Sequence, residues 1–443
     1  MPKYKIVTWG CQMNEEDSEQ MGLSLQSRGY RPARRWEEAD VVLLNTCSVR
    51  QKPEDKAFSL LGEIRQIKAE RPEMIVGVCG CMTQIRGDEI KQRAPFVDLI
   101  VGTAHVGQVG DMVDEALRLR RRSVRLELPE RKGSVVTDVP QRNVDRAPKL
   151  KAFVPIQYGC DKFCTFCIVP TTRGRERSRP TEHIVEEVRA LAERGTKEIA
   201  LLGQTVNSYG KNLLEGRVPF AKLLSLLNDI PGIERIRFTS PYPRDFKDDL
   251  IEAMAELPAV CEHIHFPLQS GDDDVLKAMR RVYTVDSYKE IAQKIRDRIP
   301  DISMTTDIIV GFPGETEEQF QNTLRVVEEL RFDGAFMFAY SPRPGTPAAE
   351  MEDQIPHDAK FDRLQRLIEL QNRITVEKNQ AQVGQLFEVL AEGRSKKNPA
   401  LLAGFNRQNK MMHFEGDDKM AGRLVKVRAI KAHLWGFYGE AVS

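Results

Sequence analysis

Short apolar runs alternate with helical patterns along most of this chain, and this alternation constrains its fold more than any other feature. One series covers residues 3–120, and a second begins at residue 151 and continues to about residue 340. Alternating strands and helices build parallel sheets with helices on their faces. We therefore expect an α/β protein with two such units, followed by a segment of another kind.

The first series predicts an open parallel α/β domain over residues 1–125. Its expected strands are residues 3–9, 41–45, 74–78 and 98–102, and its expected helices are residues 16–29, 58–70, 84–94 and 106–122. Ligands of such sheets bind beyond the carboxyl ends of the strands. The next segment, 126–145, mixes Pro, Gly and charged residues without a clear period, so we interpret it as a linker.

The second series predicts a partial (βα)6 barrel over residues 146–378. Its expected strands are residues 152–157, 198–203, 235–240, 262–269, 304–312 and 334–340. The chemistry of such a barrel lies at the carboxyl ends of its strands. A helix is expected over residues 362–380, where Leu364, Leu367, Ile368 and Ile374 share one face.

Residues 379–443 have a β-rich pattern and predict a small antiparallel β-barrel. Val425 and Val427 can face inward while Lys426 and Arg428 face outward. Small barrels of this kind often bind oligonucleotides. Lys426 and Arg428 are therefore candidate RNA contacts.

Six of the eight cysteines fall into two sets of three. The compact set is Cys160, Cys164 and Cys167, and the dispersed set is Cys11, Cys47 and Cys81, each just after an apolar run. Cysteine thiolates are the usual ligands of iron–sulfur clusters. Three thiolates on a four-iron cube leave one iron open to a substrate, so two such sets indicate radical chemistry rather than simple electron transfer.

The dispersed cysteines are expected to converge at one sheet edge because each follows a strand. Cys79 competes with Cys81 in the third segment. We favour Cys81, which lies farther past the strand end, and the reverse assignment stays open. Cys261 has no assigned role.

Structural zinc is an alternative for the compact set. Zinc normally takes four closed ligands, and Cys261, His263 or His265 could supply the fourth. The alternation of these three residues also fits one face of a barrel strand. We therefore favour a cluster over zinc.

Composition bears on location and partners. The chain has no basic leader and no apolar run near the length that spans a bilayer, so we expect a cytoplasmic protein outside the membrane. In a reducing compartment cysteines bind metals more often than they form disulfides. Basic clusters at 118–125, 172–179, 393–397 and 423–431 favour an anionic polymer such as RNA. Nothing demands more than a monomer.

The compact cysteine motif, placed after the first strand of the second series, resembles that of the radical S-adenosylmethionine enzymes. Phe166, between the last two cysteines, matches the aromatic residue usual there and is a candidate cofactor contact, with plain packing as the alternative. The resemblance implies that the open iron chelates S-adenosylmethionine and that electron transfer yields a 5′-deoxyadenosyl radical. Candidate cofactor contacts past strand ends are Gln204, Asn207, Gln269, Gly311, Gly314 and Glu315, with turn capping as the alternative.

The segments GCQMNEEDSE, NTCSVRQKPEDK, CDKFCTFCIVPTTRGRERSRP, VGFPGETEEQF and YSPRPGTPAA together resemble the methylthiotransferase family. The resemblance covers nearly the whole chain and implies a cysteine-bearing N-terminal domain, a radical S-adenosylmethionine barrel and a C-terminal TRAM domain. The QMN after Cys11 favours the MiaB-type branch, which acts on tRNA. Thr205, Pro241-Tyr242 and Arg281-Val282 depart from the commonest family pattern, and none of them is a predicted cluster ligand.

That resemblance implies methylthiolation of ring carbon 2 of N(6)-dimethylallyladenosine next to the anticodon of tRNA. The compact set would hold the [4Fe-4S] cluster that generates the radical. The dispersed set would hold an auxiliary [4Fe-4S] cluster that delivers sulfur, which a second S-adenosylmethionine methylates. The expected partners are the tRNA anticodon stem-loop, a reductant protein and a sulfur donor.

RNA contact is expected from the arginines of the TTRGRERSR segment, namely Arg173, Arg175, Arg177 and Arg179. The alternative for these residues is pairing with carboxylates of the protein itself. Two other enzymatic substrates stay open, threonylcarbamoyl-adenosine in tRNA and a ribosomal protein side chain. A non-catalytic iron–sulfur RNA-binding redox sensor is the alternative from another class.

Overall fold

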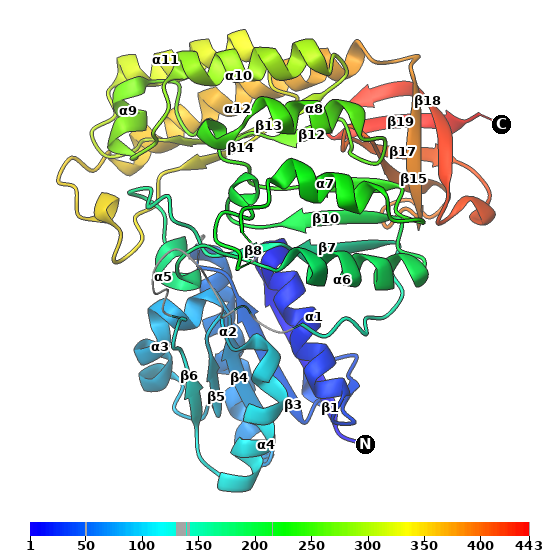
Figure 1. Cartoon of the computed structure of the whole chain (residues 1–443). Helices are drawn as coiled ribbons and strands as arrows, with labels where there is room; N and C mark the ends of the chain where they lie inside the picture. The colour runs from blue at the N-terminus through cyan, green and yellow to red at the C-terminus, as the bar shows by residue number, and fades with distance from the viewer. Residues whose placement is uncertain (49–50, 130–138, 140–141, 215, 443) are drawn as a thin grey trace.

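The computed structural model describes residues 1–48, 51–129, 139, 142–214 and 216–442 (Figure 1). The N-terminal sheet, in blue and cyan, lies against one side of the central unit, drawn from green to orange. The C-terminal barrel, in red, lies at one end of the central unit. Among the described residues, no helix combines the length and apolar character that crossing a membrane requires.

The N-terminal sheet is parallel throughout, as predicted. Its strand order is β2-β1-β3-β4-β5-β6, formed by β1 (Lys3–Trp9), β2 (Arg31–Pro32), β3 (Val41–Thr46), β4 (Ile75–Cys79), β5 (Leu99–Val101) and β6 (Ser123–Arg125). Its helices are α1 (Gln12–Gln26), α2 (Gln51–Glu70), α3 (Cys81–Arg93) and α4 (Val109–Leu119). The edge strand β6 was not predicted, because its three residues continue a basic run and carry no apolar period.

Both faces of this sheet are covered, which explains why its strands are apolar without alternation. In β3, Val42 and Leu44 pack in the core that α2 and α3 complete, whereas Val41 and Leu43 pack in the core that α1 and α4 complete. The strand ends are therefore the open part of this unit.

The central unit contains the six predicted strands in two parallel sheets. One sheet has the order β11-β10-β7 and the other β12-β13-β14, with β7 (Lys151–Pro155), β10 (Glu198–Leu202), β11 (Arg235–Phe238), β12 (His263–His265), β13 (Ser303–Val310) and β14 (Gly334–Ala339). A parallel bridge from Ile236 to Val260 continues the wall from β11 toward β12. This arrangement confirms a partial (βα)6 barrel.

Helices cover the outside of this barrel. They are α6 (Thr181–Glu193), α7 (Phe220–Asn228), α8 (Asp248–Glu256), α9 (Asp273–Ala278), α10 (Val285–Arg298), α11 (Glu317–Leu330) and α12 (His357–Gln380). Leu367 and Ile374 of α12 are buried in the core of the central unit, as the predicted helix face requires. A short hairpin of β8 (Gln157–Tyr158) and β9 (Arg177–Ser178), together with helix α5 (Val169–Arg173), lies between β7 and α6 in the chain.

The C-terminal strands form a closed barrel in the order β15-β16-β17-β19-β18. They are β15 (Leu386–Arg394), β16 (Leu402–Asn406), β17 (Met411–Glu415), β18 (Leu424–His433) and β19 (Gly436–Ala441). The neighbours β17 and β19 are parallel, which corrects the prediction of an entirely antiparallel barrel. A closed ring with an odd number of strands cannot alternate direction throughout. Val427 is buried while Lys426 and Arg428 are exposed, as predicted.

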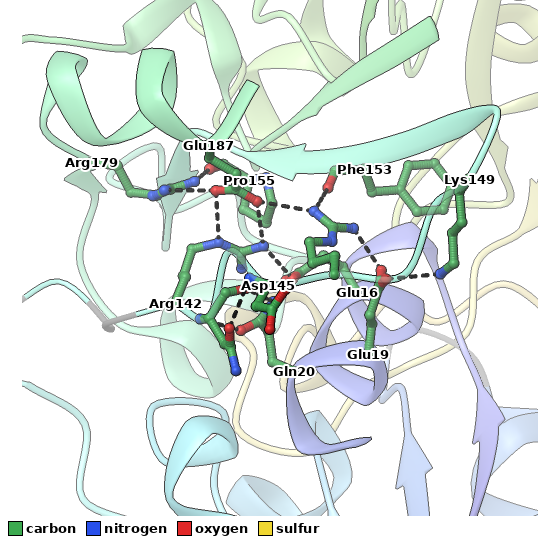
Figure 2. A network of polar contacts seen from close by, with 12 residues as sticks. Glu16, Glu19, Gln20, Arg142, Asp145, Lys149, Phe153, Pro155, Arg179 and Glu187 are labelled. Atoms are coloured by element: carbon green, nitrogen blue, oxygen red, sulfur yellow. Dashed lines mark hydrogen bonds and ion pairs between the residues drawn. The ribbon is translucent and has the colours of Figure 1, made fainter. Parts of the chain in front are cut away.

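A buried ion network joins the two α/β units (Figure 2). The carboxylate of Glu187 on α6 pairs with Arg142 at 3.1 Å, Arg146 at 2.9 Å and Arg179 at 2.8 Å. Arg142 and Arg146 also pair with Glu16 and Glu19 of α1, each at 2.5 Å. Helix α1 is thereby tied to the barrel by Arg142, near the end of the segment that we interpreted as a linker, and by Arg146, the first residue after it.

Candidate functional site

The dispersed cysteines lie at the carboxyl ends of neighbouring strands. Cys11 follows β1 and is the N-cap of α1, Cys47 follows β3, and Cys81 is the first residue of α3 after β4. The backbone N–H of Cys47 donates to the carbonyl of Trp9 at 2.9 Å, so the ends of β1 and β3 are in register. The structure thus brings these three cysteines to one sheet edge.

The thiols of this set interact with one another and with one cation. A hydrogen bond with Cys47, and then the charge of Arg173, lower the pKa of Cys11 to about 5. Burial raises the pKa of Cys81. The charge of Arg173 opposes this upward shift, and the charge of the nearby Cys11 reinforces it. Cys11 is therefore a thiolate at neutral pH, in a site that holds negative charge beside an arginine.

Cys79 lies in the core of the N-terminal sheet rather than beyond its edge. Its side chain is buried in the sheet core with Val41, Leu43 and Ile75, and burial strongly raises its pKa. The strand ends at Cys79, so Cys81 is the cysteine beyond the sheet edge. The structure therefore places Cys81, rather than Cys79, near Cys11.

The compact cysteines lie in the loop between β8 and α5. Within this loop the N–H of Cys160 donates to the carbonyl of Gly174 at 3.1 Å, and Thr165 Oγ1 donates to the carbonyl of Ala278 at 2.8 Å. Gly159 begins the loop with φ +73°, and a Cβ there would lie 2.2 Å from the carbonyl oxygen of Arg175. A side chain at position 159 would therefore prevent the close approach of the two hairpin strands.

Burial and like charge govern the thiols of this loop. Burial, reinforced by the charge of Cys164, raises the pKa of Cys160 to about 11 and of Cys167 to about 12. The guanidinium of Arg281 donates to Cys164 Sγ at 3.3 Å. Sequence reasoning noted Arg281 only as a departure from a family pattern, and no local signal linked it to a cysteine 117 residues away.

Both sets fit an iron–sulfur cluster by their donor chemistry. Each offers three cysteine thiols, and a bound cationic centre would offset the burial and like-charge repulsion that keep Cys160 and Cys167 protonated. Among the described residues, no three His, Cys, Asp or Glu side chains are grouped to hold a single metal ion. The ligands of a cube bind different irons, so they need not converge on one point.

Helix α5 connects the two cysteine sets. It begins two residues after Cys167 and ends at Arg173, whose side chain lies beside Cys11 and Cys81. A helix of this length spans about 8 Å. Thr103 Oγ1 of the N-terminal unit donates to the carbonyl of Thr172 at 2.6 Å, which fixes α5 at the junction.

The predicted cofactor contacts of the GFPGETE segment form a tight turn. Glu315 accepts hydrogen bonds from the N–H groups of Gly311 at 2.9 Å and Phe312 at 3.3 Å, and pairs with Arg363 at 3.0 Å. Gly311 and Gly314 have positive φ values of 69° and 77°. In this structure the carboxylate of Glu315 holds the turn after β13 together. The two glycines leave that turn without a side chain at positions 311 and 314.

The predicted cofactor contacts outside this segment have different surroundings from one another. The amide of Asn207 bonds both the carbonyl and the N–H of Tyr242, at 2.9 Å and 2.8 Å, as the turn-capping alternative states. Gln204 has a buried Oε1 without a hydrogen-bond partner among the described residues. Gln157 of β8, which sequence reasoning missed, has the same property at both amide atoms. Gln269 has φ +73° and bridges to Ile308 through its backbone.

Phe166 is half-buried and packs against the cluster formed by Val275, Met279, Phe312, Tyr340 and Ala348. This packing agrees with the alternative given for Phe166. It also places the aromatic ring on the barrel side of the cysteine loop.

Three of the four arginines predicted to contact RNA lie inside the protein. Arg173 pairs with Asp17 at 2.7 Å, Arg179 pairs with Glu187, and Arg177 is also buried. These pairs favour the alternative for Arg173 and Arg179, which is pairing with carboxylates of the protein itself. Arg175 is exposed and pairs with Asp161 at 2.7 Å.

The residues named for the zinc alternative have other partners. His265 Nε2 lies 3.1 Å from Asp307 Oδ2, and its Nδ1 lies 3.0 Å from Thr305 Oγ1. Burial lowers the pKa of His263 to about 3, and Cys261 is buried near Arg237. These contacts belong to the barrel wall, in agreement with the strand-face interpretation.

Comparison with known proteins identifies the family. The Radical SAM superfamily matches residues 154–327, and the Uncharacterized protein family UPF0004 matches residues 3–102. A protein of Moorella thermoacetica named tRNA-2-methylthio-N(6)-dimethylallyladenosine synthase is 48% identical over 99% of this chain and 98% of its own length. The chain belongs to this synthase family. Synthases of the same name from Desulforamulus reducens and Geobacillus kaustophilus are each 47% identical, over 99% and 100% of this chain and 95% and 82% of their own lengths.

Solved structures share much of the fold of this chain at low identity. The radical S-adenosylmethionine methyltransferase TsrM of Kitasatospora setae aligns with a TM-score of 0.57 at 14% identity, covering 79% of this chain and 75% of TsrM. The enzyme OxsB aligns with a TM-score of 0.52 at 14% identity, covering 83% of this chain and 56% of OxsB. Membership of the radical SAM superfamily implies a [4Fe-4S] cluster and S-adenosylmethionine as cofactors.

Proposed function

We propose that the protein replaces the hydrogen on ring carbon 2 of N(6)-dimethylallyladenosine, next to the anticodon of tRNA, by a methylthio group. The observation that carries this proposal is the position of two sets of three thiols at the two ends of α5. The names of relatives at 46–48% identity supply the substrate.

The compact and dispersed cysteines have separate roles in this proposal. Cys160, Cys164 and Cys167 hold the cluster that binds S-adenosylmethionine, and Cys11, Cys47 and Cys81 hold an auxiliary cluster. Bound there, these groups supply radical formation and the sulfur to be transferred. The chain itself buries the side chains of Cys160 and Cys164, and Arg281 directs an N–H to Cys164 Sγ.

The RNA would contact the exposed cations that remain after Arg173, Arg177 and Arg179 are set aside. They are Arg175 beside the compact loop, and Lys426 and Arg428 on the C-terminal barrel. Phosphate contacts would position the anticodon stem-loop, and the splayed base would enter the barrel. We further propose a monomer in the cytoplasm that receives electrons from a reductant protein and sulfur from a separate donor.

The deciding experiment is an anaerobic reaction of the reconstituted protein with reductant, S-adenosylmethionine, sulfide and dimethylallyl-modified tRNA. Nucleosides of the recovered tRNA are read by mass spectrometry. A methylthio product establishes the function. Abundant 5′-deoxyadenosine without that product would contradict the proposed substrate and keep the reaction class.

A further inference from the structure

The strand register places a set of side chains on the inner face of the barrel. His265 is paired with Thr305, Asp307 with Phe336, and Ile309 with Phe338. Paired residues of a parallel sheet share one face, and so do alternate residues of one strand. The intervening residues Ile264, Met304, Ile308 and Met337 pack in the core beneath the outer helices. The three pairs of residues named first therefore face the inside of the barrel.

This inner face combines exposed aromatic rings with an ordered carboxylate. Phe336 is 60% exposed and Phe338 is 38% exposed, which is unusual for phenylalanines in a strand whose other face is covered. The ring of His265 lies 5.7 Å from that of Phe336, and its Nε2 lies 3.1 Å from Asp307 Oδ2. Thr305 Oγ1 lies 3.0 Å from His265 Nδ1. Asp307 is thus held in place while its side chain stays 30% exposed.

The same face leads toward the compact cysteines. Ile309, next to Asp307 on this face, packs against the cluster that contains Phe312 and Tyr340. Phe166, between Cys164 and Cys167, packs against that cluster too. A planar group lying on the phenylalanines would therefore be directed toward the loop that bears the compact thiols.

We propose that this inner face binds the dimethylallyladenine base. Phe336 and Phe338 contact the five-carbon apolar group, and Asp307 accepts a hydrogen bond from the exocyclic N–H at position 6. This inference rests on the proposed function and names the residues that recognise its substrate. The two parts of the ligand match the two parts of the site, because the dimethylallyl group is apolar and the exocyclic nitrogen carries a single N–H.

The chemistry also predicts which bases the site rejects. Adenine presents N–H at position 6, whereas hypoxanthine presents a carbonyl oxygen there. A carboxylate facing a carbonyl oxygen leaves two acceptors opposed without a proton between them. Asp307 therefore favours adenine over hypoxanthine, and the phenylalanines favour the dimethylallylated base over the unmodified base.

The test measures affinity, by fluorescence anisotropy, for three anticodon stem-loops that carry dimethylallyladenosine, adenosine or inosine at the same position. The reconstituted full-length protein is used with S-adenosylmethionine present and reductant omitted. We expect Phe336→Ala to lower the preference for the dimethylallylated RNA over the adenosine RNA by about tenfold. Asp307→Leu should remove the preference for adenosine over inosine. Phe361→Ala is the matched control, because Phe361 is 50% exposed on the outer helix α12.

The outcomes separate this inference from the proposed function. Wild-type protein that forms the methylthio product, together with a Phe336→Ala variant that keeps the full preference, would overturn the inference and leave the function standing. A Phe361→Ala variant that loses the preference equally would also overturn it. Wild-type protein that shows neither product nor preference would overturn both. Phe338→Ala repeats the test at a second position, with circular dichroism as the check on folding.

Discussion

The guanidinium of Arg173 lies 2.7 Å from the carboxylate of Asp17, and both side chains are buried between the two α/β units. Arg173 ends helix α5, which follows the compact cysteines, while Asp17 lies on α1, which follows Cys11. One ion pair thus connects the segments that carry both thiol sets. It also explains how a cation can stay next to Cys11 and Cys81 inside the protein.

Replacing Arg173 by methionine should raise the pKa of Cys11, which a hydrogen bond with Cys47 and the charge of Arg173 hold at about 5. A cation favours the thiolate, so its removal shifts the midpoint upward, by roughly one pH unit or more. The measurement is the rate of iodoacetamide alkylation of Cys11 against pH in cluster-free protein, read by peptide mass spectrometry. Arg175→Met is the control because Arg175 is exposed and pairs with Asp161. An unchanged Cys11 midpoint in Arg173→Met would contradict the electrostatic role.

Single cysteine substitutions should separate the two thiol sets. Cys164→Ala should abolish cleavage of S-adenosylmethionine, whereas Cys47→Ala should retain cleavage and lose the methylthio product. Each change removes one ligand of one proposed cluster and leaves the other set complete. Both readouts, 5′-deoxyadenosine and methylthio-nucleoside, come from the same reaction mixture.

Cys79→Ala is the matched control, because Cys79 is a buried core residue one position before the turn that leads to Cys81. It should keep both readouts if it folds. Full product from Cys47→Ala would show that the dispersed set is not required.

Glu187→Gln should destabilise the protein by about 3–5 kcal/mol at pH 7, because it removes the carboxylate that three buried arginines share. Arg179 and Arg142 overcome burial and lower the pKa of Glu187 to about 2. This folded value lies below the ordinary glutamate value of about 4.5, so the stabilisation is complete above pH 4.5 and is lost as pH falls toward 2.

The difference between wild type and Glu187→Gln should therefore shrink over that acid range. Urea unfolding at a series of pH values measures it. Glu193→Gln, an exposed change on the same helix, serves as the reference. A difference that stays constant down to pH 2 would rule out the lowered pKa.

Gly159→Ala should destabilise the compact cysteine loop by roughly 2–5 kcal/mol. The residue has φ +73°, and the added Cβ would meet the backbone oxygens of Arg175 and Gly174 at 2.2 Å and 2.4 Å. Gly195→Ala is the control, because Gly195 has φ +90° but open space around it, so only the conformational cost of about 1–2 kcal/mol applies. Urea unfolding and bound iron after reconstitution measure the effect. Equal losses for the two variants would mean that crowding at residue 159 is unimportant.

The strands and helices of both α/β units followed from the alternation of apolar runs and helical patterns. Several features escaped that reasoning, among them the short strands β2, β8 and β9, helix α5, and the two that follow. Strand β6 contains only Ser123, Val124 and Arg125, too few residues to show a period. The parallel pairing of β17 and β19 results from closing a ring of five strands, and closure is a property of the assembled barrel rather than of any segment.

The cysteine positions show the same division. Spacing alone grouped Cys160, Cys164 and Cys167, because one loop contains them. Grouping Cys11, Cys47 and Cys81 required the rule that parallel strands end at one edge. The choice between Cys79 and Cys81 as the residue at the sheet edge depended on where β4 ends, which only the structure shows. The domain boundaries at residues 125, 145 and 378 and the ligand roles of the six cysteines stay predictions.

The sequence by itself determined the local patterns, since periodicity, turn residues and cysteine spacing act over a few residues. From these came two parallel α/β units, a terminal barrel and the thiol sets. Only the tertiary structure decided which charges face inward. Arg173 and Arg179 look like surface cations in the chain, yet they are buried against Asp17 and Glu187. The reason is physical: an ion pair depends on atoms brought together from distant segments, and a buried charge persists where the fold supplies its counter-charge.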